Sequence, residues 1–176
     1  EARNLSAELN GLLGFYEGQP SRGREDEQIF VHTDTYQGER TAEMLRAWGS
    51  AQGLGASTFR VGSLNTKRLE DFHEGMGHLV EWCQETLPGY RETGYRVIFN
   101  LVGGFKTLQG FMQTLGMFFA DESVYVFEGE RKLLRIPRLP VDLDAGARKI
   151  MRERADMFRR MAWTAVPLAS CTGLPE

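Results

Sequence analysis

Cysteine and histidine are scarce in this chain: it has two Cys and three His among 176 residues. Cys83 and Cys171 are far apart and form no C-x-x-C pair, so the sequence has neither a disulfide framework nor a zinc motif. Both thiols are expected to be reduced, as in an intracellular protein. His73 and His78 are five residues apart on an expected helix and face different directions. No metal site and no cofactor are predicted.

The sequence also lacks an excess of basic residues and a long apolar run. Its net charge is −3 and its pI about 5.7, which disfavours long nucleic acid but is compatible with a small phosphate ligand in a local pocket. No signal peptide or bilayer-spanning stretch is present. Because the chain begins at Glu1 with a helix pattern, we expect a segment upstream of it. That segment is expected to be either a strand or a membrane segment that tethers an otherwise cytoplasmic domain to the inner membrane.

The chain does contain a regular alternation of helix and strand patterns. Periodicity predicts these elements in chain order: helix 5–16, strand 28–32, helix 37–50, strand 58–61, helix 69–87, strand 95–100, helix 105–120, strands 123–127 and 133–136, helix 145–163. Residues 128–130 are expected to close a β-hairpin. The alternation predicts one Rossmann-like α/β domain over residues 1–176, with a mostly parallel sheet flanked by helices, a C-terminal hairpin and a last helix.

The most informative stretch is residues 100–106, Asn-Leu-Val-Gly-Gly-Phe-Lys, between a strand and an apolar helix. A strand that ends in Gly103-Gly104 and opens into a helix directs several backbone N–H groups at one point, with the positive end of the helix dipole behind them. Lys106 adds a full positive charge. The pattern predicts an anion site, with a phosphodiester as its ligand. The spacing is neither that of a P-loop nor that of a dinucleotide fingerprint, and a turn that serves packing alone is the alternative.

Two further polar turns follow strands: Thr33-Asp34-Thr35 with Gly38, and residues 63–66. The carboxyl ends of parallel strands share one edge of a sheet, so these turns and the glycine turn are expected to lie together. Asp34 or Thr35 would also suit the cap of the following helix. A carboxylate repels phosphate, so a functional Asp34 is expected at a ribose hydroxyl or an adenine amino group.

The helix expected at 105–120 is apolar nearly all round. Such a helix is buried on more than one side. It is either a central core helix or one that also meets a second subunit. A two-fold dimer would bring two glycine turns into one symmetric pocket.

Together these residues resemble the CARF (CRISPR-associated Rossmann fold) domains. The resemblance rests on residues 100–106 with the apolar helix after them, and on residues 124–129, 134–140, 6–10 and 33–38. It implies a homodimer that binds a cyclic oligoadenylate, usually cyclic tetra-adenylate, across its two-fold axis. This ligand is a second messenger of type III CRISPR antiviral defence.

The resemblance also implies roles for particular residues. It implies phosphate contacts from Gly103, Gly104 and Lys106, a turn shaped by Asn100, Phe105 and Thr107, and sugar or base contacts from Thr33 and Asp34, beside Thr35 and Gly38. Family members usually open with a strand and a small-residue turn that contacts the ligand. Neither precedes Glu1 in this sequence.

Three functions stay open at this point. The preferred one is a sensor whose ligand switches an effector outside this chain, with an N-terminal membrane segment as one option. The alternative is a metal-independent ring nuclease, in which a ribose 2′-OH attacks the neighbouring phosphate and Lys106 stabilises the transition state. The third is a Rossmann-like domain that binds another nucleotide, such as ATP or NAD, or that is only a scaffold. Ring size, cleavage and association beyond a dimer are left open.

Overall fold

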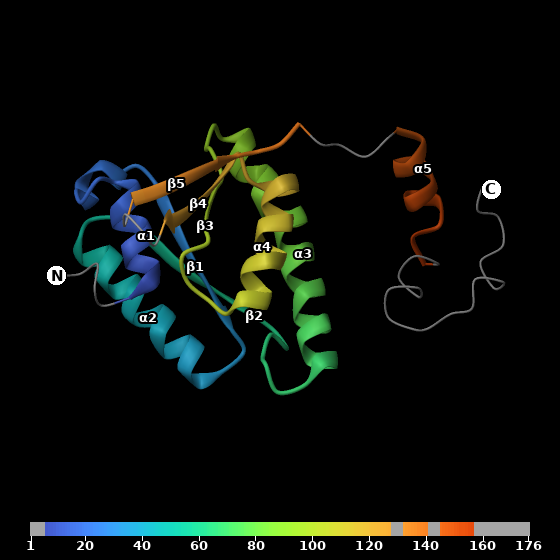
Figure 1. Cartoon of the computed structure of the whole chain (residues 1–176), viewed down its shortest axis with the longest axis horizontal. Coiled ribbons are helices and arrows are strands. Elements are labelled where there is room, and N and C mark those ends of the chain that lie inside the picture. The colour runs from blue at the N-terminus through green and yellow to red at the C-terminus, as the bar shows by residue number, and fades with distance from the viewer. Residues whose placement is uncertain (1–5, 128–131, 141–144, 157–176) are drawn as a thin grey trace. The chain divides into compact units, whose positions relative to one another are not determined.

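Helices and strands alternate along the chain, as the periodicity predicts (Figure 1). This computed structural model describes residues 6–127, 132–140 and 145–156, which fall in two units, Glu1–Leu139 and Pro140–Glu176. The elements of the first unit are α1 (Ala7–Phe15), η2 (Pro20–Gly23), β1 (Glu27–Thr33), α2 (Tyr36–Ala51), β2 (Gly55–Val61), α3 (Leu69–Glu92), β3 (Ile98–Asn100), α4 (Lys106–Phe119), β4 (Glu122–Phe127) and β5 (Lys132–Pro137). The second unit contains α5 (Ala145–Glu153), and residues 157–163 of the helix expected there lie outside the described residues. The α/β class is confirmed, whereas the single domain over 1–176 stays a prediction.

The strands form two sheets. β1 pairs in parallel with β2, so that Glu27 lies opposite Gly55 and Thr33 opposite Val61. β3 pairs in parallel with β4, and β4 pairs antiparallel with β5, which confirms the pairing of the two strands expected in a hairpin. The turn expected at residues 128–130 lies outside the described residues. Within the described residues β1 is not bonded to β3, so the continuous sheet predicted from the sequence is divided at this point.

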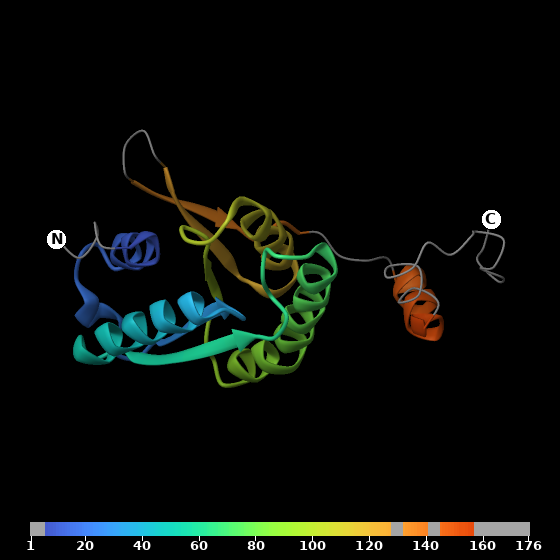
Figure 2. The same ribbon diagram turned by 90° about the horizontal axis from the view of Figure 1, so that it is seen from below.

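Helices cover both faces of the strands. Figures 1 and 2 show α1 and α2 gathered on one side of the strands and α3 and α4 on the other. On the first side, Leu9 and Leu12 of α1 and its C-cap residue Tyr16 pack with Leu45 of α2. This arrangement of helices on two faces is that of a doubly wound α/β fold.

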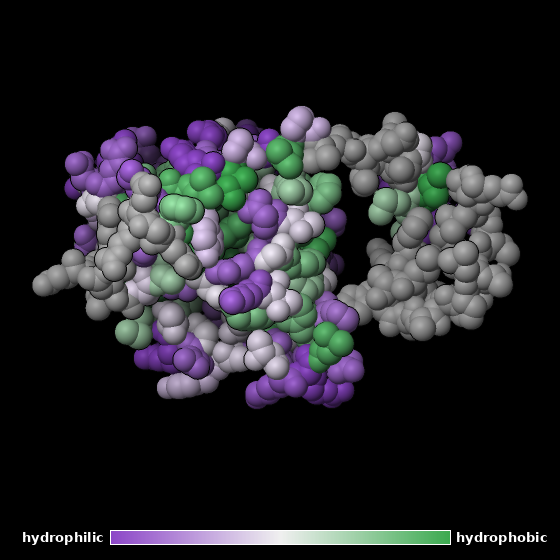
Figure 3. All heavy atoms as spheres, in the orientation of Figure 1, coloured by the Kyte–Doolittle hydropathy of each residue, from purple (hydrophilic) through white to green (hydrophobic). Residues whose placement is uncertain are grey.

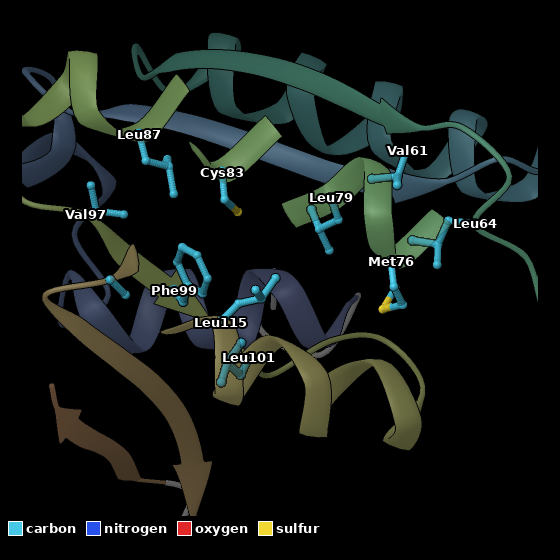
Figure 4. Packing of buried hydrophobic residues seen from close by; sticks show 11 residues of the cluster. Val61, Leu64, Met76, Leu79, Cys83, Leu87, Val97, Phe99, Leu101 and Leu115 are labelled. Carbon is cyan, nitrogen blue, oxygen red and sulfur yellow. The ribbon is translucent and has the colours of Figure 1, made fainter. Parts of the chain in front are cut away.

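The larger core cluster lies on the side of α3 and α4. Figure 4 shows Leu79 and Cys83 of α3 pointing towards Phe99 of β3 and Leu115 of α4. Burial raises the pKa of the Cys83 thiol to about 11, which keeps it protonated. Cys83 is therefore a core side chain, and Cys171 lies outside the described residues.

Several boundaries differ from the predicted ones: β2, for example, begins at Gly55 and not at residue 58. Two of the differences have a visible cause. Helix α3 was expected to end at Pro88, yet it continues to Glu92. Proline removes one helical hydrogen bond, but the following turn is held by other bonds: Arg91 Nη2 donates to the Phe119 carbonyl at 2.7 Å. Strand β3 is shorter than expected, because the Val97 N–H donates to Asp121 Oδ2 at 2.7 Å instead of to a strand.

Gly75→Ala tests how closely α3 packs against the end of β2. A Cβ at Gly75 would lie 2.6 Å from Cα and 2.7 Å from N of Leu64, backbone atoms of the turn that follows β2. We expect the free energy of unfolding to fall by about 1–3 kcal/mol, as in overpacked cores. The matched variant Gly89→Ala, on the same helix, meets no atom within 4 Å and should gain up to about 1 kcal/mol from helix propensity. Urea unfolding measures both, and equal effects would contradict the close packing.

Candidate functional site

The glycine turn leads from β3 into α4 and leaves the start of that helix open. Gly104 has a φ of +90°, a region that favours glycine, and Phe105 is the N-cap residue without a side-chain hydrogen bond to the helix. The first helical bond runs from the Gln109 N–H to the Phe105 carbonyl at 3.0 Å. Within the described part of the chain, the backbone N–H groups of residues 106–108 have no hydrogen-bond acceptor. Three donors at the positive end of the helix dipole are thus available to an anion.

Lys106 stands in the first turn of this open helix end. Its side chain is exposed, and it forms no ion pair with any residue in the described ranges. An ammonium group without an acidic partner strengthens the positive field at the helix start. Thr107 is exposed beside it.

The polar turn after β1 and the glycine turn after β3 meet at one cavity of about 500 Å³. Seven of the ten predicted site residues line this cavity: Thr33, Thr35, Gly38, Asn100, Gly103, Gly104 and Phe105. Asp34, Lys106 and Thr107 do not line it. From the third turn, residues 63–66, only Leu64 reaches the cavity.

The turn after β1 is held by its own hydrogen bonds. Thr35 Oγ1 accepts from the Gly38 N–H at 3.0 Å, so Thr35 is the cap of α2. A side chain at Gly38 would collide with Thr33 Oγ1, because α2 begins directly against the end of β1. Of the two capping alternatives, the structure selects Thr35.

Asp34 joins the ends of β1 and β2. Its Oδ1 pairs with Arg60, and its Oδ2 accepts from the Ser63 N–H at 3.1 Å. The Arg60 guanidinium and the Ser63 amide hold the pKa of Asp34 below its usual value. Both carboxylate oxygens are thus engaged within the protein.

Glu8 is a residue of this edge that sequence reasoning missed. Asn100 Nδ2 donates to the Glu8 carbonyl at 3.0 Å, which fixes the start of α1 beside the glycine turn. The Glu8 side chain packs against Gly103 so closely that a Cβ at that position would collide with Oε1. This carboxylate disfavours an anion at Gly103 itself, so the open amides of α4 and Lys106 are the better place for one. No local pattern relates position 8 to position 103.

The fold and this edge define a Rossmann-like α/β protein with an open helix start at the carboxyl ends of its strands. The chain matches the model of the CRISPR-associated protein family Cas_APE2256 over residues 3–139, and it belongs to this family. The CRISPR association implied by the resemblance is thereby confirmed. The match ends where the first unit ends, at Leu139. A comparison with curated proteins finds no match. None of the helices in the described ranges combines the length and apolarity needed to cross a membrane.

The pH dependence of Tm in the variant Asp34→Asn tests the structural role of this carboxylate. Because the pKa of Asp34 is lower in the folded than in the unfolded chain, its charge stabilises the fold at neutral pH, and this contribution is lost as pH falls through the folded pKa. The variant should lower Tm at pH 7 by roughly 2 °C, and the difference should shrink towards pH 2. Glu85→Gln, an exposed carboxylate on α3, is the control and should show no such trend. A Tm difference that stays constant with pH would argue against the bonds to Arg60 and Ser63.

Proposed function

We propose that the first unit is a CARF-type sensor domain of type III CRISPR antiviral defence. It binds a cyclic oligoadenylate, in the first instance cyclic tetra-adenylate, across the two-fold axis of a homodimer and so switches an effector outside residues 1–176. The observation that carries the proposal is the open start of α4, with free backbone donors at residues 106–108 and an exposed Lys106. Membership in a CRISPR-associated family supports the same class of ligand.

In this proposal two kinds of protein group contact the ligand. A phosphodiester oxygen accepts hydrogen bonds from the first amides of α4 and pairs with Lys106. Thr33 and Asn100, neutral polar residues that line the same cavity, suit sugar hydroxyls or base edges. Asp34, with both oxygens engaged, positions the end of β1 in this proposal.

The homodimer is proposed to form along α4. After Lys106, its exposed residues recur at helical spacing and are mostly small: Thr107, Gly110, Thr114 and Phe118. Small side chains allow two helices to approach closely, and Phe118, 43% exposed, supplies apolar area to bury. Figure 3 shows polar and apolar side chains interspersed on this face over α3 and α4. A two-fold axis at this helix would bring the two glycine turns together.

Calorimetric titration of the full-length protein with cyclic tetra-adenylate tests the proposal. Lys106→Ala should weaken binding about tenfold or more, because a charge-assisted phosphate contact is lost. Lys149→Ala removes the same charge from an exposed position on α5 and should leave the affinity unchanged. Absence of binding by the unaltered protein, or equal losses in both variants, would refute the proposed site. ATP and NAD serve as comparison ligands.

Glu8 favours ring cleavage as a second candidate function. Its carboxylate beside Gly103 could accept the proton of a ribose 2′-OH as the 2′-oxygen bonds to phosphorus. The bond from phosphorus to the 5′-oxygen breaks, and that oxygen takes a proton from solvent, which leaves a linear product with a 2′,3′-cyclic phosphate. Lys106 and the amides of α4 would stabilise the added charge.

Incubation with cyclic tetra-adenylate and EDTA separates sensor from nuclease. If the protein is a ring nuclease, linear products accumulate, and Glu8→Gln slows their formation by about 100-fold or more while binding is retained. If the ligand stays cyclic after many hours, ring cleavage is refuted and only the sensor function remains.

A further inference from the structure

The side chain of Gln109, in the first turn of α4, reaches back to the glycine turn at residues 101–105. Its Nε2 group donates to the Leu101 carbonyl and to the Gly103 carbonyl, each at 3.3 Å, which is long for such a bond. An amide NH2 group has two protons, so it can serve both acceptors at once. Gln109 is half-buried and lines the cavity, and the sequence did not single it out as a site residue.

These bonds fix the direction of the peptide group between Gly103 and Gly104. All peptide bonds of the described residues are trans. In a trans peptide the N–H points opposite to the carbonyl, so the Gly104 N–H is directed away from Gln109. Gly104 is exposed, and its N–H has no hydrogen-bond acceptor in the part of the chain that the structure describes. It is therefore a further free donor, two residues before the open amides of α4.

This peptide group is the part of the turn that is free to rotate. Glycine has no Cβ, so a peptide between two glycines can adopt both orientations without a steric penalty. The residue after it is fixed by another contact, since the centroid of the Phe105 ring lies 5.9 Å from that of the Phe72 ring of α3. For the Gly103 carbonyl, Gln109 is the one hydrogen-bond partner within the described ranges.

The orientation of this peptide group decides which charge it presents to an anion. In the observed orientation the Gly104 N–H, the positive end of the peptide dipole, is open to solvent. If the group turned over, the Gly103 carbonyl would take the place of this N–H and repel a phosphate. A donor that is already held in place loses little freedom when the ligand binds.

We propose that Gln109 is a positioning residue of the anion site. It holds the peptide group between Gly103 and Gly104 so that the Gly104 N–H donates to the same phosphate as the open amides of α4. Gln109 acts through the turn and does not contact the ligand itself. The inference rests on the proposed function for the identity of the ligand. The side chain suits this task, because both of its partners are carbonyls and it offers two donors.

Gln109→Met tests the proposal, because methionine has a similar length and helix propensity but no donor. Gln113→Met, one turn further along α4, is the matched control, since the Gln113 side chain makes no hydrogen bond to the described residues of the turn. NMR of the full-length protein without nucleotide measures the three-bond couplings between the amide proton and the Hα atoms of Gly104, which depend on φ. We expect these couplings to move towards averaged values in Gln109→Met, as the peptide rotates, and to stay unchanged in Gln113→Met. Unchanged couplings in Gln109→Met would overturn the proposal.

Titration of the same proteins with cyclic tetra-adenylate tests the role in binding. In the unaltered protein and in Gln113→Met, the Gly104 amide proton should shift downfield at saturation, because it donates to phosphate. In Gln109→Met this shift should be lost, and the affinity should fall about 3–10-fold, the effect of one hydrogen bond. A fall in affinity with the Gly104 shift retained would give Gln109 a merely structural role and overturn the proposal, as would equal affinities of the two variants.

The ligand-free couplings separate a failure of this inference from a failure of the proposed function. If the unaltered protein does not bind cyclic tetra-adenylate, the proposed function fails, and inorganic phosphate becomes the probe. A Gly104 shift with phosphate that is lost in Gln109→Met supports the inference, and the absence of any such shift overturns it. If Gln109→Met does not fold, Gln109→Glu replaces it, because a carboxylate cannot donate, with Gln113→Glu as the control of equal charge.

Discussion

The helices that begin at the carboxyl ends of the strands each start with backbone N–H groups that have no acceptor within the helix. How these groups find acceptors is the constraint on which this edge of the structure depends. Two of the helices that begin there are closed by side chains: Ser6 accepts from the N–H of Leu9 in α1, and Thr35 accepts from that of Gly38 in α2. Helix α4 begins without such a cap, and its first amides stay open beside Lys106. Helix α3 likewise begins without a side-chain cap, at Arg68. The start of α4 differs in that its open amides lie beside Lys106, which has no ion pair within the described ranges, and this combination is what the proposed function uses.

At the opposite end of β4 a charged side chain is paired within the protein. Glu122, only 8% exposed, accepts from Arg135 of β5 and from Arg96 just before β3. The Arg135 guanidinium, supported by that of Arg96, holds the pKa of Glu122 below its usual value. A buried carboxylate with two cationic partners fixes three neighbouring chain segments. At the carboxyl edge the exposed Lys106 lacks such a partner among the described residues, which is consistent with a role in binding rather than in stability.

Local patterns predicted much of the fold and part of the site. The glycine turn and the start of α4 near Phe105 follow from Gly-Gly after an apolar strand. A cap of α2 at Asp34 or Thr35 follows from a polar side chain before a helix, and the structure selects Thr35. The predicted end of α3 was wrong. The expectation that a proline ends a helix takes no account of the contact of Arg91 with Phe119, which comes from another part of the chain. The contact of Glu8 with Gly103 was not predictable either, since no periodicity relates two positions so far apart.

The amino-acid sequence by itself determined the α/β class, the alternation of its elements and the glycine turn, because each depends on neighbours within a few residues. The tertiary structure alone decided that the turns after β1 and β3 line one cavity, and that Asp34 is engaged by Arg60 and Ser63. It alone also decided that, among the described residues, β1 and β3 belong to two separate sheets. Which strand edges meet, and which remain open, is set by the packing of helices on both faces of the sheet, and this packing joins residues that the sequence keeps far apart.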